Sequence, residues 1–389
     1  MIQHFDIVIG HARRIDENMP SKPIQNNQAL AVNPTGRVAL VLMWMACLLI
    51  AFETAVQIRS YFRNGESVLN ALAGEALYVT DERTRLKVLS PNHVFHRDGT
   101  EIRTNELGLR SPSIFVAKPP NTVRIAVIGA STAMGLYAVS NEETFSYQLG
   151  KFLEASHPST HIEVINAGIS GYGLTDQSIM LEKIVLPLKP DIVIVYSGFN
   201  DFADYCRGES GEKINRARIQ RVGLPLIELP SWLLSSELIH KNTVALRSFP
   251  ANGNVYRSAA TVDLSLYKKK LEELIQVAKR GNVKLVVSTN ARAFRRDQSQ
   301  AEQEALSETA RYYNPCFDTA GLHTLHERHN NAILELTRSR GVQSVRLDEL
   351  IPGGRRYFVD ASHFSNEGEK KAAEHLRRFL DDSSLLADH

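Results

Sequence analysis

The sequence predicts an α/β protein, with a parallel sheet covered by helices on both faces and a single membrane-spanning helix before it. Two patterns support this prediction. After residue 120, short apolar runs alternate with longer stretches of helical periodicity, an order typical of parallel sheets. Closer to the N-terminus, one apolar run approaches the roughly 20 residues that a helix needs to cross a bilayer.

The composition is that of a globular chain with room for one large domain or two ordinary ones. Of the 389 residues, 43% are hydrophobic and 23% are charged, and the formal net charge is +2. This balance gives no basis for nucleic-acid binding, so no nucleic-acid partner is expected. The sequence does not indicate an oligomeric state.

The three cysteines are Cys47, Cys206 and Cys316, and none forms a C-x-x-C pair. A zinc ribbon and a thioredoxin-like motif are therefore excluded. Cys206 and Cys316 would pair if their domain faces an oxidising compartment, and two free thiols are the alternative.

The predicted transmembrane helix covers residues 37–59. Its first part, residues 38–52, has no charged residue, and Glu53 must reach the headgroups or find a partner. A cleaved signal peptide fits less well, because the run begins far from Met1 and no small-x-small site follows it. A buried core helix is the other alternative. Residues 1–36 are expected to form a polar cytoplasmic tail, although basic residues are equal in number on the two sides of the run.

The remaining chain divides into a pre-domain segment and a main domain. Residues 60–120 are mixed and polar, with turn signals at Pro91-Asn92 and Asp98-Gly99, and we expect them to link the anchor to a domain at 121–383. Residues 203–262 interrupt the α/β alternation. They are interpreted as an insertion, either a lid or a surface excursion. Residues 291–319 form a second irregular insertion.

Five apolar runs are predicted as strands, at 123–128, 162–166, 191–197, 283–288 and 344–347. Helical periodicity predicts helices at 144–156, 174–187, 264–280, 320–340 and 366–380. In a parallel sheet ligands bind beyond the carboxyl ends of the strands. The residues that follow each predicted strand are therefore the first candidates for chemistry.

Polar and small residues with catalytic potential follow three of these strands and recur near the C-terminus. They are Gly129-Ala130-Ser131, Asn166-Ala167-Gly168, Gly198-Phe199-Asn200-Asp201 and Asp360-Ala361-Ser362-His363. Each piece alone is more often a helix cap, a turn or a surface pair. Their order on an alternating α/β pattern favours a common site.

These residue types match the needs of acyl transfer. Ser131 at a strand-to-helix turn is exposed as a nucleophile, and His363 can take its proton near neutral pH. Asp360 can fix the imidazole tautomer from three residues away. The backbone N–H of Gly168 and the side-chain amide of Asn200 can donate to an oxyanion.

The four blocks resemble those of the SGNH (GDSL-like) hydrolase superfamily, over roughly residues 122–382. The resemblance implies a flavodoxin-like sheet, a catalytic triad of Ser131, Asp360 and His363, and no cofactor or metal. It also implies an oxyanion hole formed by the Ser131 N–H, the Gly168 N–H and the Asn200 side chain. Ala130 departs from the family pattern, since many members have Asp there.

Upstream, residues 104–110 are similar to an Asn-x-x-Gly-Phe/Leu-Arg element of membrane-anchored bacterial SGNH proteins, some of them linked to surface polysaccharides. The likeness implies a single-pass protein of the bacterial inner membrane whose catalytic domain is periplasmic or extracellular.

Three functions are compatible with these patterns. The leading one is a serine esterase acting through an acyl-enzyme on an O-acyl ester, such as an O-acetyl group of a surface glycan or a small molecule. An O-acyltransferase would use the same triad with a sugar as acceptor. A non-catalytic, membrane-tethered binding or assembly factor is the third.

One further cluster, His323, His326 and His329, recurs at three-residue spacing on a predicted helix. We expect a solvated helix face here rather than a metal site, because no carboxylate partner is apparent.

Overall fold

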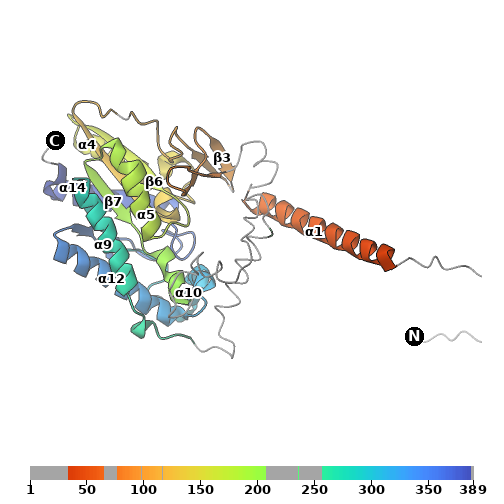
Figure 1. The fold of residues 1–389 in the computed structure, drawn as a ribbon. Coiled ribbons are helices and arrows are strands. Elements are labelled where there is room, and N and C mark those ends of the chain that lie inside the picture. Colours follow the sequence, from red (N-terminus) through yellow and green to blue (C-terminus); the bar gives the residue numbers. More distant parts are fainter. Residues whose placement is uncertain are drawn as a thin grey trace, which may run out of the picture. The chain divides into compact units, whose positions relative to one another are not determined.

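The computed structural model describes residues 34–64, 77–97, 99–115, 117–206, 235 and 256–386. The predicted tail before residue 34 and most of the predicted insertion, residues 207–234 and 236–255, lie outside the described residues. Figure 1 shows the α/β domain and the N-terminal helix α1 (Pro34–Asn64).

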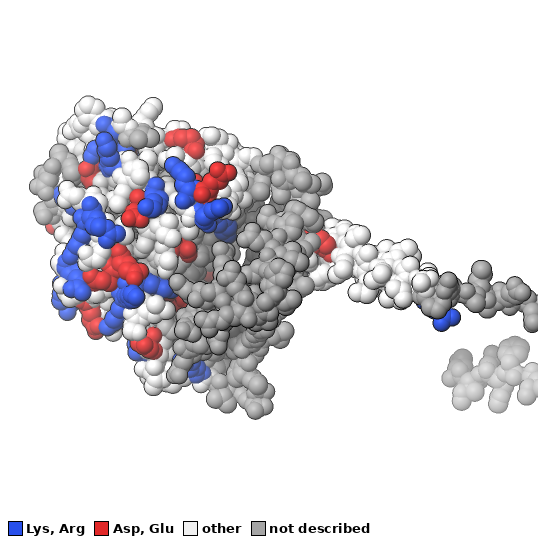
Figure 2. All heavy atoms as spheres, in the orientation of Figure 1, with Lys and Arg blue, Asp and Glu red and all other residues white. Residues whose placement is uncertain are grey.

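Helix α1 contains the predicted membrane span. Its segment Thr35–Arg59 has 25 residues and a mean hydropathy of 2.2, so it is long and apolar enough to cross a membrane. No charged residue lies between Arg37 and Glu53, and this stretch is white in Figure 2. On the α/β domain the same view shows positive and negative side chains intermixed, as the small net charge leads one to expect.

The central sheet has five parallel strands, and the predicted flavodoxin-like topology is confirmed. Its spatial order is β6 (His161–Gly168), β5 (Thr122–Gly129), β7 (Ile192–Tyr196), β8 (Lys284–Ser288) and β9 (Gln343–Val345). Numbered along the chain, this is the order 2-1-3-4-5. Gly129 pairs with Gly168 on one side and with Tyr196 on the other, so the carboxyl ends of β5, β6 and β7 lie at one edge.

Helices cover both faces of this sheet because its strands are apolar on both sides. Ile125 and Val127 face a core shared with α4 (Phe145–Ser156) and α14 (Asn366–Asp382). The alternate residues Ala126 and Ile128 face a second core shared with α5 (Leu174–Met180) and α9 (Ser265–Arg280). This two-residue alternation is the geometry of a strand buried on both faces.

The other described elements are short, except α12. They are α3 (Ser131–Met134), α6 (Ala203–Cys206), α10 (Gln300–Leu306), α11 (Glu308–Tyr313), α12 (Thr319–Arg340), α13 (Leu347–Leu350) and the 3₁₀ turns Asn141–Glu143, Leu186–Leu188, Phe199–Phe202, Ala259–Thr261 and Ser384–Leu386. The predicted helix 174–187 ends as an α-helix at Met180, and a π turn, Leu181–Val185, follows.

Part of the segment expected to be a linker belongs to the folded domain. It forms two antiparallel hairpins, β1 (Tyr78–Thr80) with β2 (Lys87–Leu89), and β3 (Val94–Arg97) with β4 (Thr100–Arg103). Apolar residues of this segment, including Leu89 and Leu109, join the same core as β5 and β6. Its strands have three or four residues, which is too short for a clear sequence period.

The loop Asn105–Arg110 is built by its asparagine and its glycine. Asn105 Oδ1 accepts hydrogen bonds from the N–H groups of Leu107 and Leu109, both at 3.0 Å. Gly108 has a φ of +68°, and a Cβ there would lie 2.2 Å from the carbonyl oxygen of Leu89. Only glycine fits that position. The loop thereby directs Arg110 into the protein.

Arg110 fastens this segment to the loop that follows the predicted nucleophile. Its guanidinium donates to the carbonyl oxygens of Gly135, Ala138 and Glu101 and to Asn141 Oδ1. The side chain is 2% exposed. Burial lowers its pKa to about 10, and nearby carboxylates oppose the shift, so the group stays charged at neutral pH. The element similar to that of anchored SGNH proteins thus has a structural role here.

Candidate active site

Ser131 stands where strand β5 turns into helix α3. A Cβ on Gly129 would lie 2.4 Å from the carbonyl oxygen of Tyr196, so the turn requires glycine. Ser131 is the first residue of α3, and its backbone N–H therefore has no carbonyl partner within the helix. Gly135, with a φ of +76°, ends the helix after one turn. The serine is held at the carboxyl edge of the sheet, as predicted.

The Asp360–His363 loop is closed by its own backbone. Phe358 and Phe364 form a β-bridge, and the Val359 N–H donates to the His363 carbonyl at 2.9 Å. Asp360 Oδ1 accepts hydrogen bonds from the N–H groups of Ser362 and His363, each at 2.9 Å. These bonds fix the carboxylate and the imidazole on one small turn.

The three side chains meet in a hydrogen-bonded relay. Asp360 Oδ2 lies 2.7 Å from His363 Nδ1, and His363 Nε2 lies 2.7 Å from Ser131 Oγ. Because an ionised carboxylate only accepts, Nδ1 carries the proton and Nε2 is left to accept from the serine hydroxyl. Residues 232 apart in the chain are brought within hydrogen-bond reach.

The carboxylate of this relay is kept ionised. Burial alone would raise the pKa of Asp360, but the hydrogen bond and charge of His363 and the two backbone N–H donors outweigh it, and the pKa lies below its ordinary value. Asp360 and His363 side chains are 14% and 15% exposed. Both side chains are thus largely buried, yet a substrate can still reach them.

Two further residues position the relay, and sequence reasoning missed both. The Tyr137 ring packs edge-on against the His363 ring, with centroids 5.3 Å apart. Thr132 Oγ1 donates to the Ser362 carbonyl at 3.3 Å, which ties α3 to the histidine loop. No sequence signal marks either contact, because each depends on two loops that are distant in the chain.

The predicted oxyanion donors have different surroundings. Asn200 lines the same cavity as Ser131, and its Nδ2 donates one hydrogen to the Tyr172 carbonyl at 3.0 Å. The second Nδ2 hydrogen remains for a ligand. Gly168 does not line that cavity, and its N–H donates to Asn166 Oδ1 at 3.0 Å. In this arrangement the Gly168 N–H is not available to a substrate.

Gly168 has a packing role instead. A Cβ at this position would lie 2.3 Å from the Met134 nitrogen and 2.6 Å from the Ala133 carbonyl carbon, so the missing side chain lets α3 pack directly on β6. The open glycine of this region is Gly171, which has a φ of +88° and no atom within 4 Å of a Cβ. It directly precedes Tyr172, the residue whose carbonyl binds Asn200.

Asp201, the residue after Asn200, fixes the position of this turn. Asp201 Oδ1 accepts from Lys270 Nζ at 3.3 Å, and Asp201 Oδ2 accepts from the Leu174 N–H at the start of α5. Burial raises the pKa of Asp201, and the charge of Lys270 opposes this shift. The turn thus connects the half-buried, cavity-lining amide of Asn200 to the largely buried Asp201–Lys270 ion pair.

A cavity of about 100 Å³ lies beside the relay. Its lining residues are Ala130, Ser131, Thr132, Phe199, Asn200, Ala203, Tyr313, Asn314, Ser362 and His363. A larger and more open hollow between α4 and α14 contains Lys370, Glu374 and Arg377 but no serine–histidine pair. The chemistry therefore belongs to the smaller cavity.

A disulfide joins the two insertions beside this cavity. Cys206 and Cys316 are bonded, with Cα atoms 5.4 Å apart, which decides between the two alternatives that the sequence leaves open. Cys206 ends α6, three residues after the cavity residue Ala203, and Cys316 follows Asn314 by two residues. The bond restrains two walls of the cavity relative to each other.

The three histidines of α12 do not form a solvated face, so that expectation is wrong. His323, His326 and His329 are each at most 1% exposed. His326 and His329 contact aromatic rings such as Phe202, whose centroid is 4.6 and 4.4 Å from theirs. Burial lowers the pKa of His329 to about 3, so it is neutral at physiological pH. Among the described residues no group of three or more ligands is placed to hold a metal ion.

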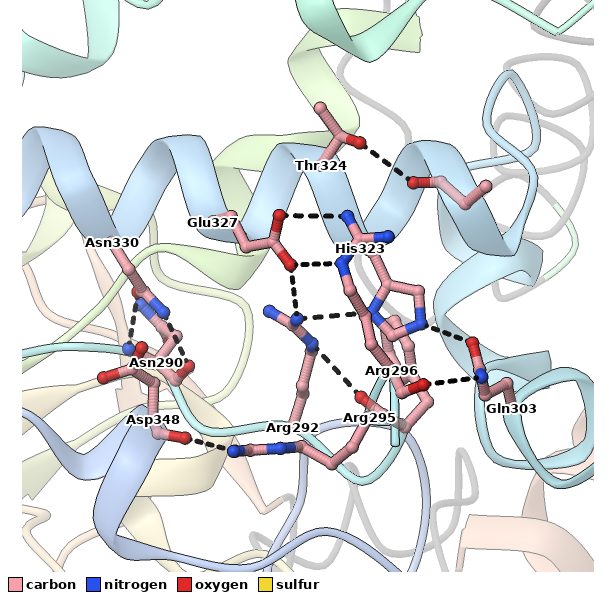
Figure 3. A network of polar contacts seen from close by, with 12 residues as sticks. Asn290, Arg292, Arg295, Arg296, Gln303, His323, Thr324, Glu327, Asn330 and Asp348 are labelled. Carbon is pink, nitrogen blue, oxygen red and sulfur yellow. Dashed lines mark hydrogen bonds and ion pairs between the residues drawn. The ribbon is translucent and has the colours of Figure 1, made fainter. Parts of the chain in front are cut away.

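His323 instead belongs to a polar network at the second insertion (Figure 3). Its Nδ1 accepts from Arg292, and its Nε2 donates to Gln303 Oε1 at 2.8 Å. Arg296 forms a two-point contact with Glu327 of α12, at 2.7 and 2.9 Å. The network ties the predicted irregular insertion to α12.

Comparison with known proteins gives only distant structural similarity. No family model matches the sequence. No curated protein matches it either. Among solved structures, this chain is similar to the acetylxylan esterase Axe2 from Geobacillus stearothermophilus. The identity is 15%, the match covers 67% of this chain and 95% of that chain, and the TM-score is 0.41. The acetyl xylan esterase AlAXEase has 16% identity, 66% and 100% coverage, and a TM-score of 0.40. A GDSL-like lipase from Bacteroides thetaiotaomicron has 12% identity, 66% and 87% coverage, and a TM-score of 0.36. The candidate site therefore stands on this chain's own geometry.

Proposed function

We propose that this chain is a membrane-anchored serine esterase that acts on an O-acyl ester through an acyl-enzyme. The Ser131–His363–Asp360 relay is the observation that carries the proposal. Ser131 Oγ attacks the ester carbonyl while His363 Nε2 takes its proton, and the same imidazole protonates the departing alcohol. Water, deprotonated by His363, then attacks the acyl-enzyme, and the acid leaves with Ser131 regenerated.

The proposed oxyanion donors are the Ser131 N–H and the free Nδ2 hydrogen of Asn200. The position of Ser131 at the start of α3 supports the first, and the cavity-lining position of Asn200 supports the second. Gly168, the donor that the sequence motif implies, would first have to release Asn166.

A short acyl group, such as acetyl, is the proposed acyl part of the substrate. The cavity has a volume of about 100 Å³, which favours a small acyl group, and the side chains of Phe199 and Ala203 supply apolar contacts for it. The alcohol part of the ester extends out of the cavity toward solvent, so the cavity volume restricts its size less than that of the acyl group. An acylated glycan or a small sugar ester fits this description.

We propose that the catalytic domain works on the oxidising side of a bacterial inner membrane, held there by α1. The length and hydropathy of Thr35–Arg59 support the anchor. The Cys206–Cys316 bond supports the location, because disulfides persist in the periplasm and outside the cell and are rare in the cytosol.

Acyl-chain profiling of the full chain in detergent tests the proposal. Wild type should hydrolyse 4-nitrophenyl acetate faster than the butyrate and octanoate esters, and Ser131→Ala should lose at least about 10³-fold in kcat. Equal activity in Ser131→Ala would refute the mechanism. Product analysis with a sugar acceptor present separates hydrolysis from acyl transfer, since only a transferase would form the acylated sugar.

A further inference from the structure

Two adjacent tyrosines lie on the solvent side of α11, at the rim of the catalytic cavity. Tyr313 lines the cavity that holds Ser131 and His363. Tyr312 and Tyr313 are 74% and 59% exposed. Their rings meet edge to face, with centroids 5.1 Å apart. We call this pair the Tyr312–Tyr313 platform.

Packing does not explain the platform. The inward face of α11 is made by Ser307, Ala310 and Asn314, which recur at helical spacing and are each at most 1% exposed. Tyr312 falls on the opposite face of the same turn and Tyr313 on its flank, beside the cavity, and both side chains stay largely exposed. Aromatic side chains gathered in the open beside a cavity are typical of a binding surface.

Hydrogen bonds and a disulfide fix the backbone of α11 that carries the platform. Ser307 Oγ and Thr319 Oγ1 are 2.9 Å apart, and the Asn314 N–H and Nδ2 both donate to the Ala310 carbonyl. The disulfide at Cys316 fixes the chain two residues later. The network in Figure 3 anchors the preceding helix α10 through Gln303 to α12. Because this segment is already ordered, a ligand loses little free energy in immobilising it, and this favours binding.

The surroundings of the platform decide which ligand it fits. Six of the ten cavity residues are polar: Ser131, Thr132, Asn200, Asn314, Ser362 and His363. Asn314 Oδ1 is buried and has no hydrogen-bond partner in the described part of the chain. A lipid alcohol would need a continuous aliphatic surface at this rim. A sugar ring offers a C–H face to a tyrosine and hydroxyls to polar neighbours.

We infer that the Tyr312–Tyr313 platform binds the pyranose ring of the alcohol part of the substrate and presents its ester to Ser131. The inference rests on the proposed esterase function and adds the chemical class of the alcohol. Tyr313, which lines the cavity, stacks on the sugar that carries the ester. Tyr312 contacts the same ring or the next one.

Binding is measured first in a background that cannot turn over. Full-length Ser131→Ala in detergent is titrated calorimetrically with a methyl glucopyranoside mono-acetate, which keeps three free hydroxyls for the polar cavity residues. Adding Tyr313→Ala should weaken binding about tenfold, the effect of one lost aromatic contact, and adding Tyr313→Phe should retain most of it. Phe115→Ala is the control: this ring is 73% exposed, and its backbone is bound by Arg124 near the amino end of β5.

Turnover then separates a sugar from a lipid ligand. With Ser131 present, kcat/KM for the pyranoside acetate should fall about tenfold more than kcat/KM for hexyl acetate in Tyr313→Ala. An equal fall for both esters, or a larger fall for hexyl acetate, would overturn the inference. Tyr313-independent binding in the Ser131→Ala background would overturn it as well. Absence of turnover in wild type with Tyr313-dependent binding intact would instead count against the esterase function alone.

Discussion

Replacing Arg110 by Met tests whether the segment before the sheet belongs to the catalytic domain. The change keeps most of the side-chain volume and removes every donor of the guanidinium. Four acceptors lose this donor: the carbonyl oxygens of Gly135, Ala138 and Glu101, and Asn141 Oδ1. Of these, the Gly135 carbonyl keeps the Ala138 N–H and Asn141 Oδ1 keeps the Arg103 N–H. Each lies in a region that water does not readily reach, because Arg110 itself is 2% exposed.

The size of the effect follows from these contacts. An unsatisfied buried acceptor costs about 1–3 kcal/mol, and removing one member of a buried charged network costs about 3–5 kcal/mol in total, since the individual terms do not add. At roughly 2–4 °C per kcal/mol for a domain of this size, Tm should fall by about 6–20 °C. Arg110→Lys should lie between, because one ammonium cannot reach all four acceptors.

Thermal unfolding of the full chain in detergent, followed by circular dichroism, provides the measurement. Arg83→Met is the matched control, since this arginine is 75% exposed in its ion pair with Asp81 and should cost less than about 0.5 kcal/mol. A Tm for Arg110→Met within about 2 °C of wild type would refute the structural role of Arg110.

Three further predictions concern the relay, the disulfide and one buried acid. Asp360→Asn should lower kcat by about 10³–10⁴-fold with little change in KM, because the amide no longer selects the imidazole tautomer of His363; an effect below tenfold in steady-state assays would exclude that role. Cys206→Ser with Cys316→Ser should lower the free energy of unfolding by about 2–5 kcal/mol and raise KM, and unchanged denaturation and KM would contradict a restrained cavity wall. Burial raises the pKa of Glu369 to about 8, against the opposing effects of the Phe145 N–H and Arg110. The folded state keeps Glu369 protonated at pH values where the unfolded chain, with the ordinary pKa of 4.5, has lost this proton. The free energy of unfolding is therefore highest below pH 4.5 and falls by up to about 1.4 kcal/mol per pH unit as the pH rises toward 8. Glu369→Gln should flatten that part of the Tm–pH curve, and a parallel curve would contradict it.

The sheet was predictable because its strands are buried on both faces. Strands β5, β7 and β8 are nearly continuous apolar runs, and their alternation with helical periods leaves few other folds. The edge strand β9, which is only three residues long and partly exposed, gives a weaker signal. The short hairpins of residues 78–103 escaped notice because they have only three or four residues per strand. Helix α10 had a usable signal, the capping box formed by Ser299 and Glu302.

Within the site, the sequence predicted which residues lie together better than it predicted what each residue does. Ser131, Asp360 and His363 each follow a recognisable local pattern, and the structure brings them together. The role of Gly168 depends on Asn166, two residues away, whose side chain takes its N–H. Contacts such as that of Tyr137 with His363 join loops that the chain keeps far apart, so a local pattern contains no information about them.

The same reason explains the histidines of α12. A spacing of three residues places His323, His326 and His329 on neighbouring positions of a helix, but does not say what packs against them. Their burial is set by Phe202 and Phe294, which come from loops elsewhere in the chain.

The central claim is that Ser131 is a nucleophile activated by His363. Labelling of the full chain with a fluorophosphonate, followed by mass spectrometry of the digested protein, tests it most directly. We expect one adduct on the peptide that contains Ser131, no adduct there in Ser131→Ala, and labelling at least about 10²-fold slower in His363→Ala. Labelling at another residue, or an undiminished rate in His363→Ala, would contradict the claim.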